Sequence, residues 1–242
     1  MTTLLEAARA PDVEDRTATA VARLREVAAS DGWGALEWSR PTPSAAFSHR
    51  DQRGPGFGAA VAAVQRRGFE PFIRPVGGRL ACYDEGALVL DVLLRCRDPR
   101  PGTTARFRLL ADAIAVGLRR LGVDARTGAV PGEYCPGEWS VNACGTAKLV
   151  GTGQRLVRDA VLFTAVVVVG RPEAMAGAMA EAYDHLGLEF DPRSVGGVCQ
   201  YVPGVALADV EDAVGGAVAE LMQLSAPDLV AGRALLGPWD PR

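Results

Sequence analysis

Lysine and histidine are almost missing from this chain. Its 242 residues contain 26 lysines and arginines, of which only Lys148 is a lysine, and two histidines, His49 and His185. Two histidines are too few for a histidine-rich metal site and, without a GxSxG sequence, give little support to a serine hydrolase triad. A genome that favours arginine codons explains the arginines but not why one lysine remains. Lysine offers a compact ammonium with a tunable pKa, so Lys148 is a candidate functional residue, with a leftover codon as the alternative.

Long apolar runs and signal-like segments are absent too. No stretch of about 18 uninterrupted apolar residues occurs, so we expect no membrane-spanning helix. Residues 1–16 carry four acidic side chains and no apolar core segment, which argues against a signal peptide. A formal charge of −3 and an acidic pI offer no basic face for nucleic acid. Five cysteines without paired spacing form neither a disulfide framework nor a zinc site, so we expect a cytoplasmic protein with reduced thiols.

Hydrophobic periodicity and turn residues predict one α+β domain over residues 1–242, with a mixed or antiparallel sheet and helices packed on one side. Helices are expected at residues 12–29, 58–67, 103–121, 172–186 and 207–224. Strands are expected at residues 35–39, 44–48, 70–74, 79–83, 87–94, 123–126, 139–143, 147–151 and 157–169. The stretch 127–138, rich in glycine and proline, is expected to form a loop.

A pair of glycines stands out in the segment Arg74-Pro-Val-Gly-Gly-Arg79, between two expected strands. Adjacent glycines let a backbone approach a ligand closely and adopt positive φ. Consecutive amide groups at Gly77 and Gly78 are suited to binding a carbonyl oxygen, a phosphate or the polar end of an acyl chain. An ordinary hairpin turn is the alternative, because such turns also favour Gly-Gly.

Cys135 lies in the polar loop Glu133-Tyr-Cys-Pro-Gly-Glu138, where a thiol is more exposed than in a strand. Exposure is a requirement for a nucleophilic cysteine. Cys82 and Cys96 fall in or at the end of apolar strands, where cysteine usually behaves as a small hydrophobe. Cys144 is a second candidate because it is only four residues from Lys148. An incidental loop thiol remains the alternative for Cys135.

Lys148 belongs to the run Ala147-Lys-Leu-Val-Gly-Thr-Gly-Gln-Arg155. On a short strand before two glycines, its ammonium is expected to reach into a pocket. There it would donate to an acyl carbonyl or lower the pKa of a nearby thiol. The alternative for Gly151-Thr-Gly153 is a hairpin turn; the run matches neither a dinucleotide loop nor a phosphate loop.

Taken in order, these segments resemble the family of lipoate–protein ligases and octanoyltransferases, whose fold is that of the biotin/lipoate protein ligase catalytic domain. The resemblance covers roughly residues 35–200. It rests on the runs SAAFSHRD (44–51), IRPVGGRLACYDEGALVL (73–90), EYCPGEW (133–139) and KLVGTGQR (148–155). A cysteine in a Cys-Pro-Gly loop before the lysine is similar to the amidotransferase branch. That branch passes an octanoyl or lipoyl group from the glycine cleavage H protein to other lipoyl domains through a cysteine thioester.

The resemblance implies an acyltransferase in which Cys135 is the nucleophile and Lys148 the cation that positions the carbonyl. It also implies substrate-binding roles for Arg74, Gly77, Gly78, Arg79, Gly151 and Gln154. The implied partners are lipoyl carrier domains, namely the glycine cleavage H protein and the E2 subunits of 2-oxoacid dehydrogenases, or acyl carrier protein. No metal and no cofactor is required on this interpretation.

Two alternatives stay open. An ATP-dependent lipoate–protein ligase would need ATP and magnesium, and Lys148 would then hold the phosphate of a lipoyl-adenylate. Such ligases usually carry His-His-Gly after the lysine strand, where this chain has residues 159–165 without a histidine. A non-catalytic, carrier-binding relative is suggested by Pro75 and Val76, which stand where family members commonly have a second Arg and a Ser before the glycine pair.

Overall fold

Two β-sheets organise the chain in the computed structural model, which describes residues 5–9 and 16–231. The large sheet has the strand order β1 (Leu5–Arg9), β2 (Gly34–Ser39), β6 (Ala87–Arg95), β10 (Ala160–Val168), β9 (Ala147–Val157), β8 (Val141–Ala143) and β7 (Ala125–Thr127). The small sheet has the order β4 (Glu70–Ile73), β3 (Ser44–Phe47) and β5 (Ala81–Tyr83). Among these strands of the described residues, the pairs β1–β2 and β3–β4 are parallel and the others are antiparallel. The α+β class with mixed sheets is confirmed.

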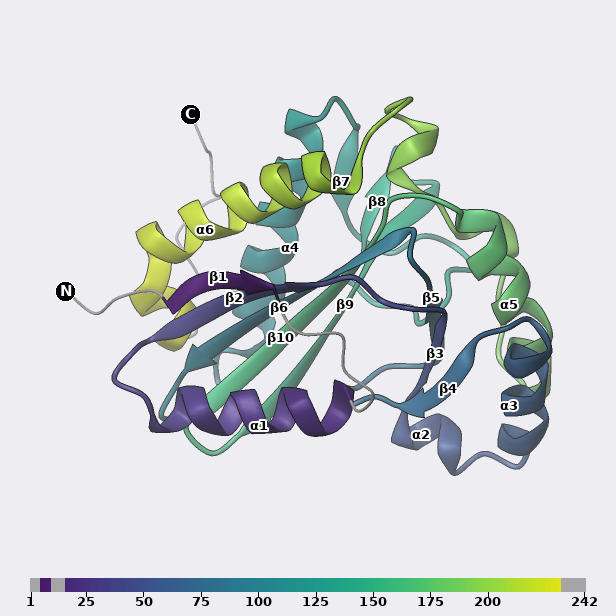
Figure 1. The fold of residues 1–242 in the computed structure, drawn as a ribbon, viewed down its shortest axis with the longest axis horizontal. Helices are drawn as coiled ribbons and strands as arrows, with labels where there is room; N and C mark the ends of the chain where they lie inside the picture. The colour runs from purple at the N-terminus through teal and green to yellow at the C-terminus, as the bar shows by residue number, and fades with distance from the viewer. Residues whose placement is uncertain (1–4, 10–15, 232–242) are drawn as a thin grey trace.

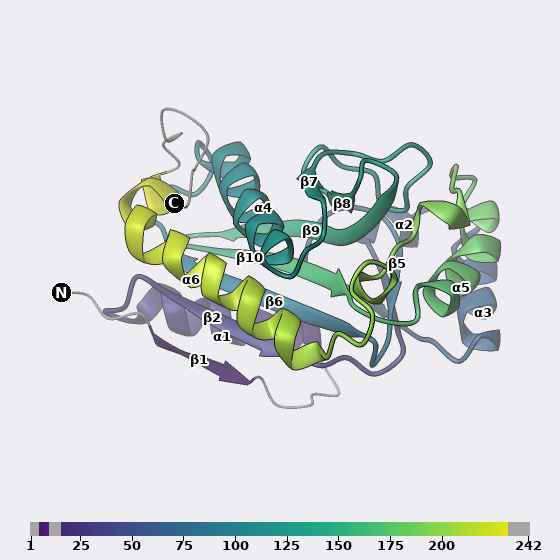
Figure 2. The same ribbon diagram turned by 90° about the horizontal axis from the view of Figure 1, so that it is seen from above.

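Helices cover both faces of the large sheet (Figures 1 and 2). Helix α1 (Arg16–Ala29) lies on one face, and α4 (Thr103–Arg120) and α6 (Leu207–Ala231) lie on the other. Val92 belongs to the core under α4 and α6, whereas the next residue, Leu93, packs with the α1 side. The expectation of helices on one side is therefore wrong: β6 is apolar on both faces, and such a strand needs cover on both.

The small sheet packs against α3 (Phe57–Arg66) and α5 (Pro172–His185), which lie side by side (Figure 1). Its core is fully buried and includes Phe47, Val64 and Met179. The connecting segments form three short helices, α2 (His49–Gln52), η1 (Pro192–Ser194) and η2 (Val198–Gln200). Across the described part of the chain, every helix is too short or too polar to cross a lipid bilayer.

Strand β9 runs without interruption through Gly151 and Gly153, so the hairpin turn considered there is wrong. The chain reverses instead after β9, where Asp159 has a φ of +66°. Gly153 has a packing reason, because a Cβ atom on it would lie 3.0 Å from the side chain of Val76. Glycine in this strand therefore marks a close approach of another segment rather than a turn.

Candidate active site

Cys135 lies in the loop between β7 and β8, half-buried, in the left-handed region with a φ of +44°. Its Sγ accepts a hydrogen bond from the backbone N–H of Arg79 over 3.2 Å. It accepts a second from Nη2 of Arg74 over 3.3 Å. Both donors belong to the segment between β4 and β5, so the fold brings two predicted parts of the site together around one sulfur atom.

These contacts favour the thiolate form of Cys135. Burial raises the pKa of the thiol, but the charges of Arg74 and Lys148 and the Arg79 N–H lower it by more. The net result is a pKa below the ordinary value for cysteine. Burial raises the pKa of the Cys82 thiol. A thiolate is the nucleophilic form of cysteine, so Cys135 is the thiol prepared for reaction.

The side chain of Lys148 supports the loop that carries Cys135. Its side chain is 1% exposed, and its ammonium donates to the carbonyl oxygens of Tyr134 at 2.9 Å and Cys135 at 3.0 Å. It also lies 3.6 Å from Oε1 of Glu133 and 4.5 Å from the centre of the Tyr134 ring. The lysine that was expected to reach into a pocket contacts backbone carbonyls of the loop that carries Cys135.

Glu133 and Tyr183 complete this support of the loop. The buried carboxylate of Glu133 accepts hydrogen bonds from the backbone N–H of Gly137 at 2.8 Å and the hydroxyl of Ser140 at 2.9 Å. The Tyr183 hydroxyl accepts from the backbone N–H of Cys135 and donates to the Leu80 carbonyl, each over 2.7 Å. Tyr183 therefore connects the cysteine loop to the segment that supplies the Arg79 amide.

Asp51 fixes that segment from the other side, and the sequence interpretation missed it. Its Oδ1 pairs with Nη1 of Arg79 at 3.1 Å, and its side chain is fully buried. Its Oδ2 accepts from the backbone N–H and hydroxyl of Ser48, which forms a capping box at the start of α2. The Ser-x-x-Asp spacing in residues 48–51 is the sequence signal for such a box.

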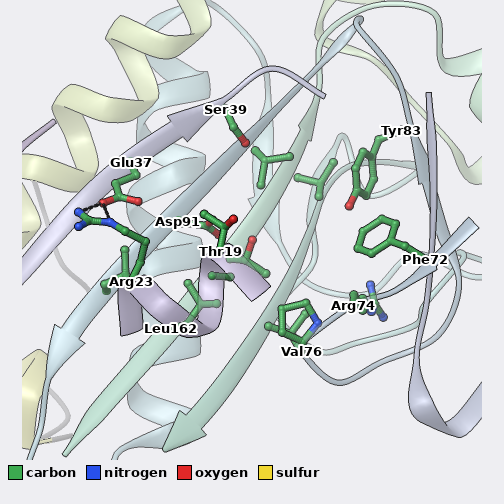
Figure 3. Close-up of a pocket in the computed structure, with 16 residues that line it drawn as sticks. Thr19, Arg23, Glu37, Ser39, Phe72, Arg74, Val76, Tyr83, Asp91 and Leu162 are labelled. Atoms are coloured by element: carbon green, nitrogen blue, oxygen red, sulfur yellow. Dashed lines mark hydrogen bonds and ion pairs between the residues drawn. The ribbon is translucent and has the colours of Figure 1, made fainter. Parts of the chain in front are cut away.

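A pocket lies between α1 and the face formed by β2, β6 and β10 (Figure 3). Segment 72–76 forms its other wall, and Arg74 belongs both to this wall and to the shell around Sγ. Apolar walls include Phe72, Val89 and Val166. A mostly apolar lining with a few placed polar groups is typical of a ligand pocket.

Of the remaining predicted residues, two lie at the site and two do not. Gly78 lies directly against Cys135 and Arg74, and a Cβ atom on Gly151 would be 3.5 Å from Cε of Lys148, so both lie at the site. Gly77 has open space around its Cα. The structure turns Gln154 to the opposite face of the sheet, where its amide donates to the Thr103 carbonyl over 3.0 Å. Gln154 therefore does not reach the pocket.

Among the described residues, no three His, Cys, Asp or Glu side chains lie close enough to hold a metal ion. The five cysteines are unpaired thiols, and of these Cys144 is exposed. The chemistry that these residues can carry is thus nucleophilic attack by Cys135, with Arg74 and the Arg79 amide as donors beside it.

Comparison with known proteins identifies the family. Residues 57–218 match the model of the lipoyl protein ligase A/B catalytic domain, and the chain belongs to this family. The octanoyl-[GcvH]:protein N-octanoyltransferase of Anoxybacillus flavithermus is 30% identical over 138 residues, which is 56% of this chain and 48% of the relative. The chain therefore matches about half the length of this curated relative.

Solved structures share the fold. A protein from T. acidophilum described as a lipoate protein ligase, with lipoic acid bound, matches 92% of this chain and 86% of its own. Its TM-score is 0.69 and its sequence identity 19%. A lipoate-protein ligase A structure with bound ATP matches with the same coverage and TM-score at 20% identity. At these identities the likeness establishes the architecture.

Proposed function

We propose that this chain transfers an octanoyl or lipoyl group to a lysine of a lipoyl carrier domain through a thioester on Cys135. The observation that carries the proposal is the position of Sγ, which accepts from the Arg79 N–H and from Arg74, a residue that also lines a largely apolar pocket. The lowered pKa of Cys135 supports it. So does the octanoyltransferase name of the curated relative.

Two displacement steps describe the reaction. The Cys135 thiolate attacks the carbonyl carbon of the donor's thioester or amide; a C–S bond forms, and the donor's thiol or amine leaves with a proton. The carrier lysine amine then attacks this thioester, a C–N bond forms, its proton is released, and the thiolate returns. Arg74 and the Arg79 N–H are placed to stabilise the oxyanion of each tetrahedral intermediate. Lys148 acts through the loop backbone.

The partners under this proposal are protein carriers. The glycine cleavage H protein is the donor suggested by the relative's name, and E2 subunits of 2-oxoacid dehydrogenases or acyl carrier protein are further candidates. A cytoplasmic location is part of the same proposal. The reaction as written needs no cofactor, whereas the ligase alternative needs ATP and magnesium.

Mass spectrometry after incubation with an octanoyl-carrier protein tests the proposal. An octanoyl mass increase on the Cys135 peptide, lost when unmodified carrier is added, supports thioester transfer. Formation of lipoyl-AMP from lipoic acid and ATP, with no adduct on Cys135, supports the ligase instead. If carrier binds but neither product forms, the chain is a non-catalytic relative.

A further inference from the structure

A row of polar side chains crosses the middle of the pocket. Asp91 on β6 is the direct cross-strand partner of Glu37 on β2 and of Thr164 on β10. All three side chains line the cavity. Arg23 of α1 joins the row and donates through Nε to Oε1 of Glu37 over 2.9 Å. Charged residues are rare at inward positions of an apolar sheet unless they are paired or bind something.

Hydroxyl groups approach the same space from other directions. Thr19 projects from α1 and Ser39 from the end of β2, and both line the pocket together with Thr164. Within residues 16–231, none of these three hydroxyls makes a side-chain hydrogen bond. The pocket therefore offers hydroxyls that the protein itself leaves unused, next to the carboxylate of Glu37, which can accept several hydrogen bonds.

The row lies away from the reacting sulfur. Figure 3 shows Arg74 and Phe72 at one side of the pocket, the Arg23–Glu37 pair at the opposite side, and Asp91 between them. Arg74 is the residue that contacts Sγ of Cys135. An acyl chain held on Cys135 would thus pass the apolar wall of Phe72 first, and its distal half would meet the polar row.

A plain alkyl chain fits this row poorly. It would exclude water from the carboxylates and hydroxyls without replacing the lost hydrogen bonds, which is unfavourable for buried polar groups. A chain that carries a hydroxyl at the same depth would donate to Glu37 and accept from Thr164. Sites built around such a bond discriminate strongly against the analogue that lacks the hydroxyl.

We propose that the acyl group handled by this pocket is a medium-length chain that carries a hydrogen-bond donor, such as a hydroxyl, on its distal half. The proposal rests on the thioester transfer proposed for Cys135, and it replaces the unsubstituted octanoyl or lipoyl group by a chain with a distal donor as the preferred substrate. It predicts that unsubstituted octanoyl is the poorer ligand of the two.

Calorimetric titration of the full-length protein with primary amides tests the inference without turnover. Octanamide, 6-hydroxyoctanamide and 8-hydroxyoctanamide present the carbonyl of the acyl group but no good leaving group. We expect one hydroxylated amide to bind at least about tenfold more tightly than octanamide. The inference is overturned if the hydroxylated amides do not bind detectably, or if they bind no more tightly than octanamide.

Matched variants locate the effect. Thr164→Val keeps the side-chain shape but removes the hydroxyl, so the affinity ratio between hydroxylated and plain amide should fall toward one. Thr104→Val is the control, because Thr104 is exposed on α4, on the other face of the sheet. An unchanged ratio in Thr164→Val overturns the role of the polar row.

The two proposals fail separately. If Cys135 gains no acyl group from any donor, the transfer function is wrong, yet the amide titrations still decide the ligand class. If octanoyl is loaded onto Cys135 and octanamide binds as tightly as the hydroxylated amides, the transfer function stands and the preference is wrong.

Discussion

A Cβ atom on Gly78 would lie only 2.6 Å from Sγ of Cys135. The backbone of Gly78 also has a φ of +108°, which glycine adopts far more readily than other residues. Two independent requirements thus fall on one glycine, one from the backbone and one from the space around the sulfur. Its neighbour Gly77 has neither requirement, since nothing lies within 4 Å of a Cβ there.

Gly78→Ala should therefore slow acylation of Cys135 by at least about tenfold, because the added methyl displaces Sγ or the Arg74 guanidinium from its present position. A time course of adduct formation by mass spectrometry measures this rate. Gly58→Ala on α3 is the control, since open space surrounds that position. Near-normal acylation in Gly78→Ala would show that the crowding around Sγ is irrelevant to the reaction.

Arg74→Met should raise the pKa of Cys135. In the wild-type protein, burial opposes the thiolate, and the charges of Arg74 and Lys148 outweigh burial. The alkylation rate at Cys135 should reach half of its maximum below the free-thiol pKa of about 8.5. Without the guanidinium this midpoint moves to higher pH, and alkylation at neutral pH becomes slower, because only the thiolate reacts.

Peptide mapping after limited iodoacetamide treatment separates Cys135 from exposed Cys144. Cys135 should react first at neutral pH, and acyl donor should protect it. A Cys135 midpoint that does not move in Arg74→Met, or faster labelling of Cys144, contradicts the assignment of the reactive thiol.

Much of the fold follows from local patterns. The continuous apolar run of β6 and the long periodic segment of α4 were predicted to within one residue at each end. The turn between β9 and β10 was misplaced because Gly151 and Gly153 resemble a turn locally. The reason for Gly153 is the side chain of Val76, which comes from a segment far earlier in the chain, and no local pattern reports such a contact.

The site was predictable where chemistry lies in short motifs. The Gly-Gly segment, the cysteine loop and the lysine strand meet in the fold, as their order suggested. Successive residues of a strand point to opposite faces of the sheet, so Gln154 and Gly153 face different sides. The position of Gln154 away from the pocket was therefore foreseeable. No sequence motif indicated the role of Tyr183. Its two hydrogen-bond partners, Cys135 and Leu80, lie 48 and 103 residues before it in the chain.

Asp51→Asn should weaken catalysis through Arg79 without any contact to the acyl group. The amide keeps the size of the carboxylate but loses the ion pair at 3.1 Å, so the Arg79 segment is less firmly held against Cys135. We expect kcat to fall about tenfold while the KM for the donor changes little, since small displacements at a reacting centre are costly.

A merely structural role for Asp51 is tested in the same variant. The alkylation midpoint of Cys135 should rise in Asp51→Asn, because the Arg79 N–H that favours the thiolate is displaced. Asp51→Glu, which restores the charge, should recover part of the rate. If stability falls while the midpoint and kcat stay normal, Asp51 serves only the capping box of α2.

Lys148→Arg should impair both stability and transfer. The ammonium fits between the carbonyls of Tyr134 and Cys135 at 2.9 and 3.0 Å in a fully buried position, where the larger planar guanidinium has no room. Overpacking of this kind costs about 1–3 kcal/mol, which thermal or urea unfolding would detect. The displaced loop should slow acyl transfer about a hundredfold, because the nucleophile moves away from its reacting position. Arg25→Lys on α1 is the matched control for the exchange of the two cations at an exposed position. A Lys148→Arg protein with normal stability and normal transfer would show that the solitary lysine is an accident of codon usage.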